Sequence, residues 1–432
     1  MDVVRARSTP PLVLLLLLLS ACGMDNGKVR AESVEKPSAE CASSALPNQF
    51  LVTWNDGSIT VEQAEDRDAL ARDLLQPHLG EIVLAEHDQK VSLNEIRVSP
   101  KSSLRASSKV TPASDYRAWG HERIEAPSVW PIATGKDVIV AVVDSGVDVT
   151  HPQLVNQIAV NTKEIPGNGL DDDGNGYVDD VRGYDFEQKS GNVTDGSGHG
   201  THVAGIIAAE HQSGNAMKGV APDAKILPLD FMDDAGQGMM SDAIAAIQYA
   251  VSRGARVVNA SWGGGCSKTL RSVVSTLGSR GVLFIAASGN GDAYNVGQDL
   301  EKSPTYPGAF GLPDAITVGA STYNDYMTSF SNYSRKLVHL VAPGQGVFST
   351  YPASAKCETY AGSGYCYEDG TSMATPFVSG AAAVLWSHRP NATVAQIRKA
   401  LLDGVDKGTY AVSTEGRLNL RKSLEALTVL VP

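Results

Sequence analysis

The stretch "DVIVAVVD", residues 137–144, is an almost unbroken apolar run that ends on an aspartate. It lacks the alternation of a half-exposed strand, and such runs are typical of strands buried on both faces of a parallel sheet. Four similar runs follow it, at residues 224–230, 255–261, 281–288 and 315–320. The five runs together predict one parallel sheet.

Helical segments separate these runs. Residues 240–254 ("MSDAIAAIQYAVSRG") and 268–281 ("KTLRSVVSTLGSRG") are two examples, and each ends on a glycine. Glycine is favoured just after a helix C-terminus because it adopts a positive φ at little cost. Alternating strands and helices predict a doubly wound α/β domain. Ligands bind beyond the carboxyl ends of the strands in such domains, so the polar residues that end the runs are the candidates for chemistry.

Composition limits the range of functions. The chain has 432 residues, of which 42% are hydrophobic and 42 are glycines, so it is globular and long enough for more than one domain. Lys and Arg total 36 and Asp and Glu total 48, which gives a formal net charge of -12. This charge argues against nucleic acid or an anionic membrane surface as the main partner.

The N-terminus predicts export. Two arginines precede an apolar run that fits the core of a secretory signal peptide and is too short to span a membrane. Leu19, Ser20, Ala21 and Cys22 resemble the lipobox of bacterial lipoproteins, in which the cysteine is acylated and becomes the mature N-terminus. The alternative is an ordinary signal peptidase site that includes a cysteine. Residues 1–22 are therefore interpreted as a signal peptide, and a lipid on Cys22 is the only membrane contact that we expect.

The segments before the α/β domain differ in composition. Residues 23–48 are polar and contain two prolines, which predicts a linker. In residues 49–100, strand-like ends flank an amphipathic helical stretch at 60–79, so a small α+β domain is expected. Residues 101–114 are rich in serine, which predicts an exposed, cleavable connection. The large domain then spans residues 115–432.

Four cysteines remain once Cys22 is set aside. An even number in an exported protein suggests disulfides. Cys357 and Cys366 are the easiest pair to join, because the loop between them is short. Cys41 and Cys266 are then left, either paired or free, since sequence alone does not determine connectivity.

Three polar residues carry the candidate chemistry. Asp144 ends the first apolar run, His199 lies between two glycines before an apolar helical stretch, and Ser372 lies in "GTSMATP" before another. Taken singly, they fit a turn residue, a structural histidine and a helix N-cap. His202 raises the alternative of a metal site, but the glutamate of an H-E-x-x-H motif is missing. Taken together, the three supply a nucleophile, the base that it needs, and the carboxylate that orients the base.

The surrounding motifs resemble one family. The stretches are "VVDSGVD", "GHGTHVAGI", "GVAPDAKI", "NASWGGG", "AASGN" and "GTSMATP", and they extend over residues 115–425. Together they resemble the subtilisin-like serine proteases (subtilases), whose Asp, His, Ser order along the chain is also found here. The resemblance implies a subtilisin-like parallel sheet flanked by helices. It also implies Asp144 as orienting acid, His199 as general base, Ser372 as nucleophile and Asn290 as the side-chain donor to the oxyanion.

The same resemblance implies where a polypeptide substrate binds. Ser261, Trp262 and Gly263 are expected to pair with the substrate backbone, and Gly264 belongs to the same strand of the pocket wall. Glycines leave that wall without side chains, so we expect bulky apolar residues at P1, the substrate position before the cut. Two other functions were weighed. A catalytically inactive subtilase fold would serve as a binding module, and a lipase or esterase is disfavoured by the order of the triad along the chain.

The resemblance further implies a zymogen. Residues 49–100 would be an inhibitor-type propeptide that helps the enzyme fold, occupies its cleft and is removed by it near residues 99–114. If Cys22 carries a lipid, this cut separates the protease from the membrane unless a bridge between Cys41 and Cys266 retains it. We expect the protein to be made as a lipoprotein precursor in the bacterial cell envelope. Processing then releases the protease, unless the bridge retains it, and we expect the protease to be a monomer.

The stretch "GLDDDGNGYVDD", residues 169–180, predicts a calcium site. Its alternating oxygen donors follow the first half of an EF-hand loop. These donors are Asp171, Asp173, Asn175 and the carbonyl of Tyr177. Arg182 occupies the position of the EF-hand glutamate, so Asp179 and Asp180 are expected to supply the missing oxygens. The alternative is a solvated acidic loop, but so many adjacent carboxylates repel one another unless a cation neutralises them.

Overall fold

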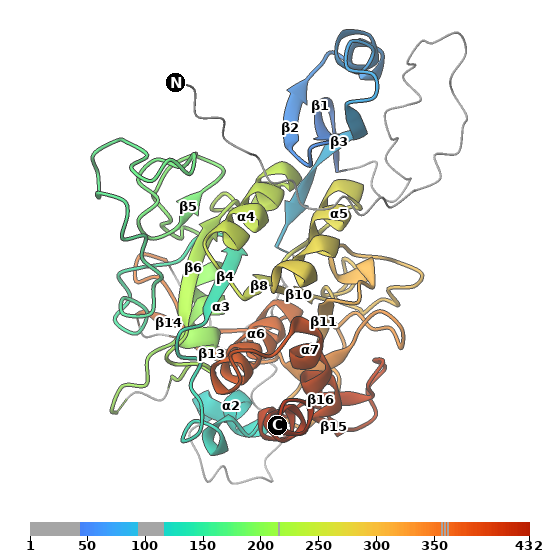
Figure 1. Ribbon diagram of the computed structural model, residues 1–432. Helices are drawn as coiled ribbons and strands as arrows, with labels where there is room; N and C mark the ends of the chain where they lie inside the picture. The colour runs from blue at the N-terminus through green and yellow to red at the C-terminus, as the bar shows by residue number, and fades with distance from the viewer. Residues whose placement is uncertain (1–43, 94–115, 215–216, 356, 358–359, 361–362) are drawn as a thin grey trace.

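The fold centres on a nine-stranded sheet with helices on both faces (Figure 1). The computed structural model describes residues 44–93, 116–214, 217–355, 357, 360 and 363–432. In spatial order the strands are β15 (Val405–Lys407), β16 (Gly416–Leu418), β12 (Leu340–Pro343), β11 (Ala315–Ser321), β10 (Leu283–Ala287), β8 (Val257–Ala260), β4 (Ile139–Asp144), β6 (Lys225–Asp230) and β5 (Tyr184–Asp185). All neighbouring pairs are parallel except β15 with β16. The five apolar runs form five adjacent strands of this sheet, from β11 to β6, which confirms the predicted fold class.

Strand β4 shows why its sequence does not alternate. Val140 and Val142 belong to the hydrophobic cluster on one face of the sheet, and Ala141 and Val143 belong to the cluster on the other. All four are at most 1% exposed. Because both faces are covered, every position of the strand before the terminal Asp144 is apolar.

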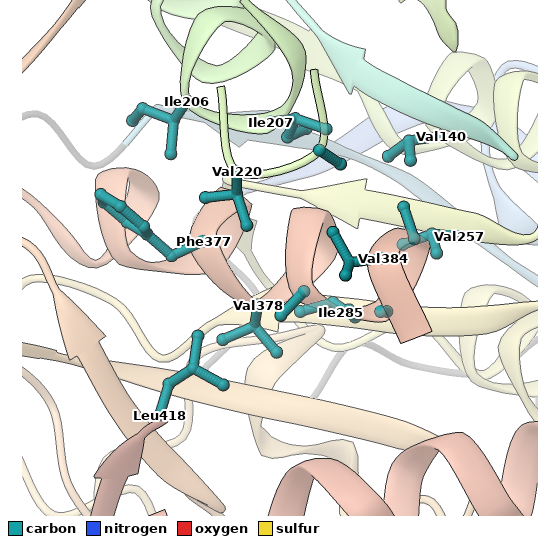
Figure 2. Packing of buried hydrophobic residues seen from close by; sticks show 14 of the residues in the cluster. Val140, Ile206, Ile207, Val220, Val257, Ile285, Phe377, Val378, Val384 and Leu418 are labelled. Carbon is teal, nitrogen blue, oxygen red and sulfur yellow. The ribbon is translucent and has the colours of Figure 1, made fainter. Parts of the chain in front are cut away.

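Helices α3 (His199–Ala208) and α6 (Thr371–His388) pack together in the first cluster. Figure 2 shows Val378 of α6 toward Ile285 of the sheet, and Ile206 of α3 farther from that residue in the same cluster. The helices α2 (Trp119–Arg123), α7 (Val394–Asp403) and α8 (Leu420–Leu430) also contribute to this cluster. On the other face lie α4 (Met240–Ser252) and α5 (Lys268–Leu277). The glycines that follow α4 and α5, Gly254 and Gly281, both have a positive φ as predicted.

The N-terminal domain is a separate small sheet with its own hydrophobic cluster. It comprises β1 (Ala45–Trp54), β2 (Ile59–Gln63), α1 (Arg67–Leu70), a π-helical turn (Ala71–Leu75) and β3 (Ile82–Ser92). Two expectations were wrong in detail here. The linker expected to reach residue 48 already belongs to β1 from Ala45. The helix expected from residue 60 begins only at Arg67, because Asp66 caps it and residues 59–63 pair with β1 instead.

Strand β3 extends beyond the small domain, toward α4 and α5 (Figure 1). There it pairs antiparallel with β7 (Gln237–Met239) on one side and β9 (Gly263–Gly264) on the other. A two-stranded sheet of β13 (Val347–Thr350) and β14 (Tyr365–Glu368) precedes α6, with the predicted disulfide between Cys357 and Cys366. Short 3-10 turns occupy residues 116–118, 126–128, 278–280 and 308–310.

The signal peptide with its lipobox, Cys41, and the cleavable connection at 101–114 lie outside the described residues. Within the described part of the chain, no helix has the length and apolar character needed to cross a membrane. Cys266 is disulfide-bonded, to a partner outside the described residues.

Candidate active site

The fold brings Asp144 and His199 into direct contact. Asp144 is the last residue of β4 and His199 is the first residue of α3. The His199 Nδ1 and Asp144 Oδ1 atoms are 2.7 Å apart, and Asp144 is fully buried. Because a carboxylate only accepts, Nδ1 carries the proton, and Nε2 is the nitrogen that can act as a base.

Both glycines beside His199 are required by close packing. Gly198 has φ of 95°, and a Cβ atom there would lie 2.3 Å from the Tyr351 ring. A Cβ atom on Gly200 would lie 2.0 Å from the carbonyl oxygen of Gly146. The backbone beside His199 is therefore tightly confined, which explains the glycine on each side of it.

Asp195 is a residue of this site that sequence reasoning missed. Its Oδ2 accepts from the Thr201 N–H at 2.8 Å and the Thr201 hydroxyl at 2.6 Å, which holds the first turn of α3. Its Oδ1 accepts from the Gly198 N–H at 2.7 Å and the Ser145 hydroxyl at 3.1 Å. Burial raises the pKa of Asp195 to about 6, against the opposing effect of these hydrogen bonds. The only sequence signal for Asp195 was its position, four residues before His199 and just before the expected helix, where an aspartate often caps the helix N-terminus.

The charges around His199 favour its protonated form. Burial lowers the pKa of His199, but the negative charge of Asp144 and its hydrogen bond outweigh burial and raise the pKa above the ordinary value. Glu368 and Asp195 add to the increase. His202, one turn further along α3, stays neutral because burial and the nearby His199 lower its pKa to about 3. The 3.8 Å approach of His202 Nδ1 to Glu368 Oε2 is therefore not an ion pair at neutral pH.

Ser372 is the second residue of α6, and it is 6% exposed. Its hydroxyl donates to the Ser261 carbonyl at 2.9 Å, and the Ser261 hydroxyl donates to the Ser372 carbonyl at 2.9 Å. Among the hydrogen bonds of the described residues, none joins Ser372 Oγ to His199. A hydroxyl rotates readily, and such catalytic contacts often form only when substrate is bound.

Asn290 lies just beyond β10, beside the start of α6. Its Oδ1 accepts from the backbone N–H and the hydroxyl of Thr371, both at 2.8 Å. These two bonds fix which end of the amide faces Thr371, so the Nδ2 end faces away from that residue. The helix N-terminus next to it adds a partial positive charge, which favours an anion at this position.

The predicted substrate strand is occupied by the chain's own β3. Val91 is paired with Gly264 and Ser92 with Gly263, while the Leu93 N–H donates to the Gly236 carbonyl at 2.9 Å. A Cβ atom on Gly264 would lie 2.7 Å from Val91, so glycine is needed for this approach. The small domain thus inserts a strand between β7 and β9.

Comparison with known proteins identifies the family. The model described as Subtilase family matches residues 135–418, well over half of the chain. This chain belongs to the subtilase family. Thermitase of Thermoactinomyces vulgaris is 34% identical over 73% of this chain and 99% of thermitase. The alkaline protease of Alkalihalobacillus alcalophilus is 33% identical over 83% of this chain and 87% of that protein. With relatives of this kind, the chain is a serine endopeptidase of the subtilisin type.

A solved structure supports the same fold. The crystal structure of fervidolysin from Fervidobacterium pennivorans, a keratinolytic enzyme related to subtilisin, matches with a TM-score of 0.71 and 26% identity. The match covers 93% of this subtilase but only 64% of the fervidolysin chain.

The Trp262 side chain of this subtilase has a structural role. It is 2% exposed, and its Nε1 donates to the Val143 carbonyl of β4 at 3.0 Å. Of the expected substrate-binding residues, Trp262 can therefore contribute only its backbone. The backbone pairing is instead made by its neighbours Gly263 and Gly264.

Two carboxylates of β3 cap helices of the subtilase domain. Glu86 accepts from the Ser267 hydroxyl at 2.6 Å and from the N–H groups of Lys268 and Thr269, both at 3.0 Å, at the start of α5. Asp88 accepts from the Ser241 N–H at 3.1 Å, in the first turn of α4. Both carboxylates are buried, and each satisfies backbone donors that a helix N-terminus leaves unpaired.

The acidic loop of this subtilase assembles differently from the EF-hand-like expectation. Asp179 accepts from the N–H groups of residues 167–169, at 2.8, 3.1 and 2.9 Å. Asp180 is fully buried and accepts from Asn175 Nδ2 at 2.7 Å and the Tyr249 hydroxyl at 2.6 Å. Both carboxylates thus hold the loop itself, and a role for Asp179 and Asp180 as metal ligands stays a prediction. Asn175 and Tyr177 also bond within the loop, the Tyr177 N–H donating to Asn175 Oδ1 at 2.8 Å.

Asp171 and Asp173 instead lie beside Glu164. One carboxylate oxygen from each of the three lies within 4.8 Å of the others. Glu164 was missed because it precedes the motif by several residues and carries no signal of its own in the sequence.

Proposed function

We propose that this subtilase is an exported endopeptidase that cleaves polypeptides through an acyl-enzyme on Ser372. The observation that carries the proposal is the 2.7 Å contact between His199 and the fully buried Asp144, at the carboxyl end of the sheet where Ser372 also lies. The alternative is a catalytically inactive binding module. It is disfavoured because all four expected catalytic positions carry a residue that can perform the chemistry.

Each residue has a distinct role in the proposed reaction. His199 Nε2 takes the proton from Ser372 Oγ as it attacks the peptide carbonyl, and Asp144 stabilises the resulting imidazolium. The Asn290 amide and the Ser372 N–H donate to the developing oxyanion. His199 then returns the proton to the leaving amine, and water hydrolyses the acyl-enzyme by the same route. P1 preference for bulky apolar residues remains a prediction from the glycines around Gly263.

The small N-terminal domain is proposed to be an inhibitory propeptide. Its strand β3 supports this role because it occupies the edge positions where a substrate would pair. Ser92 is opposite Gly263, which is only two residues from Ser261, and the Ser261 carbonyl accepts from Ser372 Oγ. We therefore expect the first cut close to the end of β3, ahead of the connection at 101–114.

The proposed location is the bacterial cell envelope. The signal peptide and the lipobox cysteine Cys22 support export as a lipoprotein precursor. Cys266 is disulfide-bonded, which supports a bridge to Cys41. Ser44, three residues after Cys41, donates to Gln89, and the Gln89 amide donates to the Cys266 carbonyl at 2.5 Å, so the two cysteines belong to neighbouring segments. Such a bridge would retain the cut propeptide on the enzyme, which we propose acts as a monomer.

A structural calcium ion is part of the proposal. The chemistry of the donors in the acidic loop supports it, since carboxylate oxygens are the ligands that calcium prefers. Its contribution would be to hold the loop, away from the reacting groups.

Replacing Ser372 by alanine tests the proposed function. Ser372→Ala should abolish both self-processing and hydrolysis of an unfolded protein such as reduced casein. Ser387→Ala, on the same helix, is the matched control and should retain both. Processing of Ser372→Ala at the wild-type rate in a purified sample would defeat the assignment of Ser372 as the nucleophile. A wild-type protein that neither processes itself nor cleaves casein would favour the binding-module alternative.

A further inference from the structure

Glu164 has a buried carboxylate that is only half satisfied. It is 6% exposed, and its Oε1 accepts from the N–H groups of Asp172 and Asp173 at 2.9 and 3.1 Å. Its Oε2 is buried and has no hydrogen-bond partner. A buried charge without a partner is costly, so such a group is normally paired or bound to a metal.

The neighbours of this carboxylate add negative charge. Asp171 and Asp173 each place an oxygen within 4.8 Å of Glu164 and of each other. In the described part of the chain, no lysine or arginine forms an ion pair with any of the three. The group therefore lacks a protein cation to neutralise it.

The backbone around the aspartates is already shaped for a cation. Asp171 accepts from the N–H groups of Asn175 and Gly176, at 3.1 and 2.8 Å, and Gly176 has φ of 94°. This is the turn that the first half of an EF-hand loop requires. Arg182 stands where the loop's acidic last ligand would be, so that ligand has to come from elsewhere.

We propose that Glu164, Asp171 and Asp173 bind a calcium ion, with Glu164 Oε2 replacing the carboxylate that an EF-hand takes from its twelfth residue. The inference rests on the calcium of the proposed function and specifies the ligands. Oxygens up to 4.8 Å apart can all contact one ion at the 2.3–2.6 Å typical of calcium. An all-oxygen, all-carboxylate set disfavours metals that prefer nitrogen or sulfur. Water and backbone carbonyls would complete the shell.

The site connects the loop to the body of the enzyme. Asp173 Oδ2 accepts from Asn161 Nδ2 at 3.1 Å, and the same nitrogen donates to Asp180 at 2.6 Å. Asp180 accepts in turn from the hydroxyl of Tyr249 on α4 at 2.6 Å. Calcium bound at Glu164 would thus rigidify a hydrogen-bonded path from the loop to α4.

Calcium titration of the full-length chain tests the proposal. The Ser372→Ala background prevents self-cleavage, and binding is measured by calorimetry with calcium chloride and by terbium luminescence excited through nearby tyrosines. Glu164→Gln should weaken calcium binding by about tenfold or more, because it removes a charged ligand. Asp172→Asn is the matched control. Its side chain accepts from the Ile165 N–H and Asn168 Nδ2, outside the group of three, so its affinity should stay near wild type.

Two results would overturn the assignment. Wild-type affinity in a folded Glu164→Gln protein would remove Glu164 from the site and leave the rest of the calcium proposal standing. No calcium binding by the parent protein at millimolar concentration would end both calcium proposals, while peptidase activity of the unmodified enzyme would remain unaffected. If Glu164→Gln fails to fold, Asp173→Asn gives the same comparison and must also weaken binding.

Discussion

The Glu86 carboxylate offers a sharp test of how the propeptide holds the enzyme. It is 5% exposed and accepts three hydrogen bonds at the start of α5, from Ser267, Lys268 and Thr269. Glu86→Gln keeps the size of the side chain. It removes the negative charge and replaces one carboxylate oxygen by an NH₂ group. This NH₂ group then faces a hydrogen-bond donor of α5 and cannot accept from it.

The expected loss follows from these contacts. Hydrogen bonds to a charged group are worth about 1.5–3 kcal/mol each, and an anion at a helix N-terminus adds about 0.3–1 kcal/mol. Glutamine retains one acceptor oxygen, so we expect a net loss of about 3 kcal/mol in propeptide binding. At 1.4 kcal/mol per factor of ten, this is a dissociation constant raised about 100-fold.

The assay uses the full chain. Wild type and Glu86→Gln are allowed to process themselves, and the active fraction is measured with a fluorogenic peptide over a range of protein concentrations. Parallel series with and without a thiol reductant separate non-covalent retention from any covalent link at Cys266. Glu65→Gln, exposed on the same domain, serves as control and should behave as wild type. An unchanged dissociation constant for Glu86→Gln would refute the idea that this cap anchors the propeptide.

Three further predictions concern the catalytic domain. Glu368→Gln should shift the acidic limb of the kcat/KM pH profile to lower pH, because Glu368 raises the pKa of His199 and only neutral His199 is a base. An unshifted limb would argue against this influence. Asp195→Ala should lower the free energy of unfolding by about 2–4 kcal/mol, measured by urea titration of an inactive background, since buried donors at the start of α3 lose their acceptor; a change below 0.5 kcal/mol, as is common for surface sites, would contradict the capping role. Replacing both Cys357 and Cys366 by serine should cost about 3 kcal/mol for a loop of this length, seen as earlier thermal unfolding, and an unaltered melting temperature would count against it.

The sequence predicted the sheet from local patterns, and it predicted the pairing of Asp144 with His199 through the resemblance of the motifs around them to the subtilases. A run such as residues 139–143 has no polar position, since helices cover both faces of the sheet. The glycines on both sides of His199 indicate in the sequence that the backbone is closely packed there, because only glycine permits such close approaches. Features that depend on neighbouring residues in this way can be predicted from the sequence.

The errors arose where a partner comes from a distant segment. The hydrogen bonds of Asp179 and Asp180 within the folded loop were likewise not visible in the sequence, although their role as metal ligands stays a prediction. Glu164 and Asp195 look like ordinary surface acids until tertiary structure buries them. Residues 59–63 illustrate the same limit, since pairing with β1 overrides their helical pattern.

Labelling of the nucleophile tests the central claim most directly. A fluorophosphonate that reacts with activated serines should inactivate the processed enzyme in a one-to-one ratio, and mass spectrometry of the digest should place the adduct on Ser372. Prior replacement of His199 by alanine should prevent the labelling, because the hydroxyl then lacks its base. Full labelling of another serine, or peptidase activity that persists with Ser372 fully modified, would contradict the account.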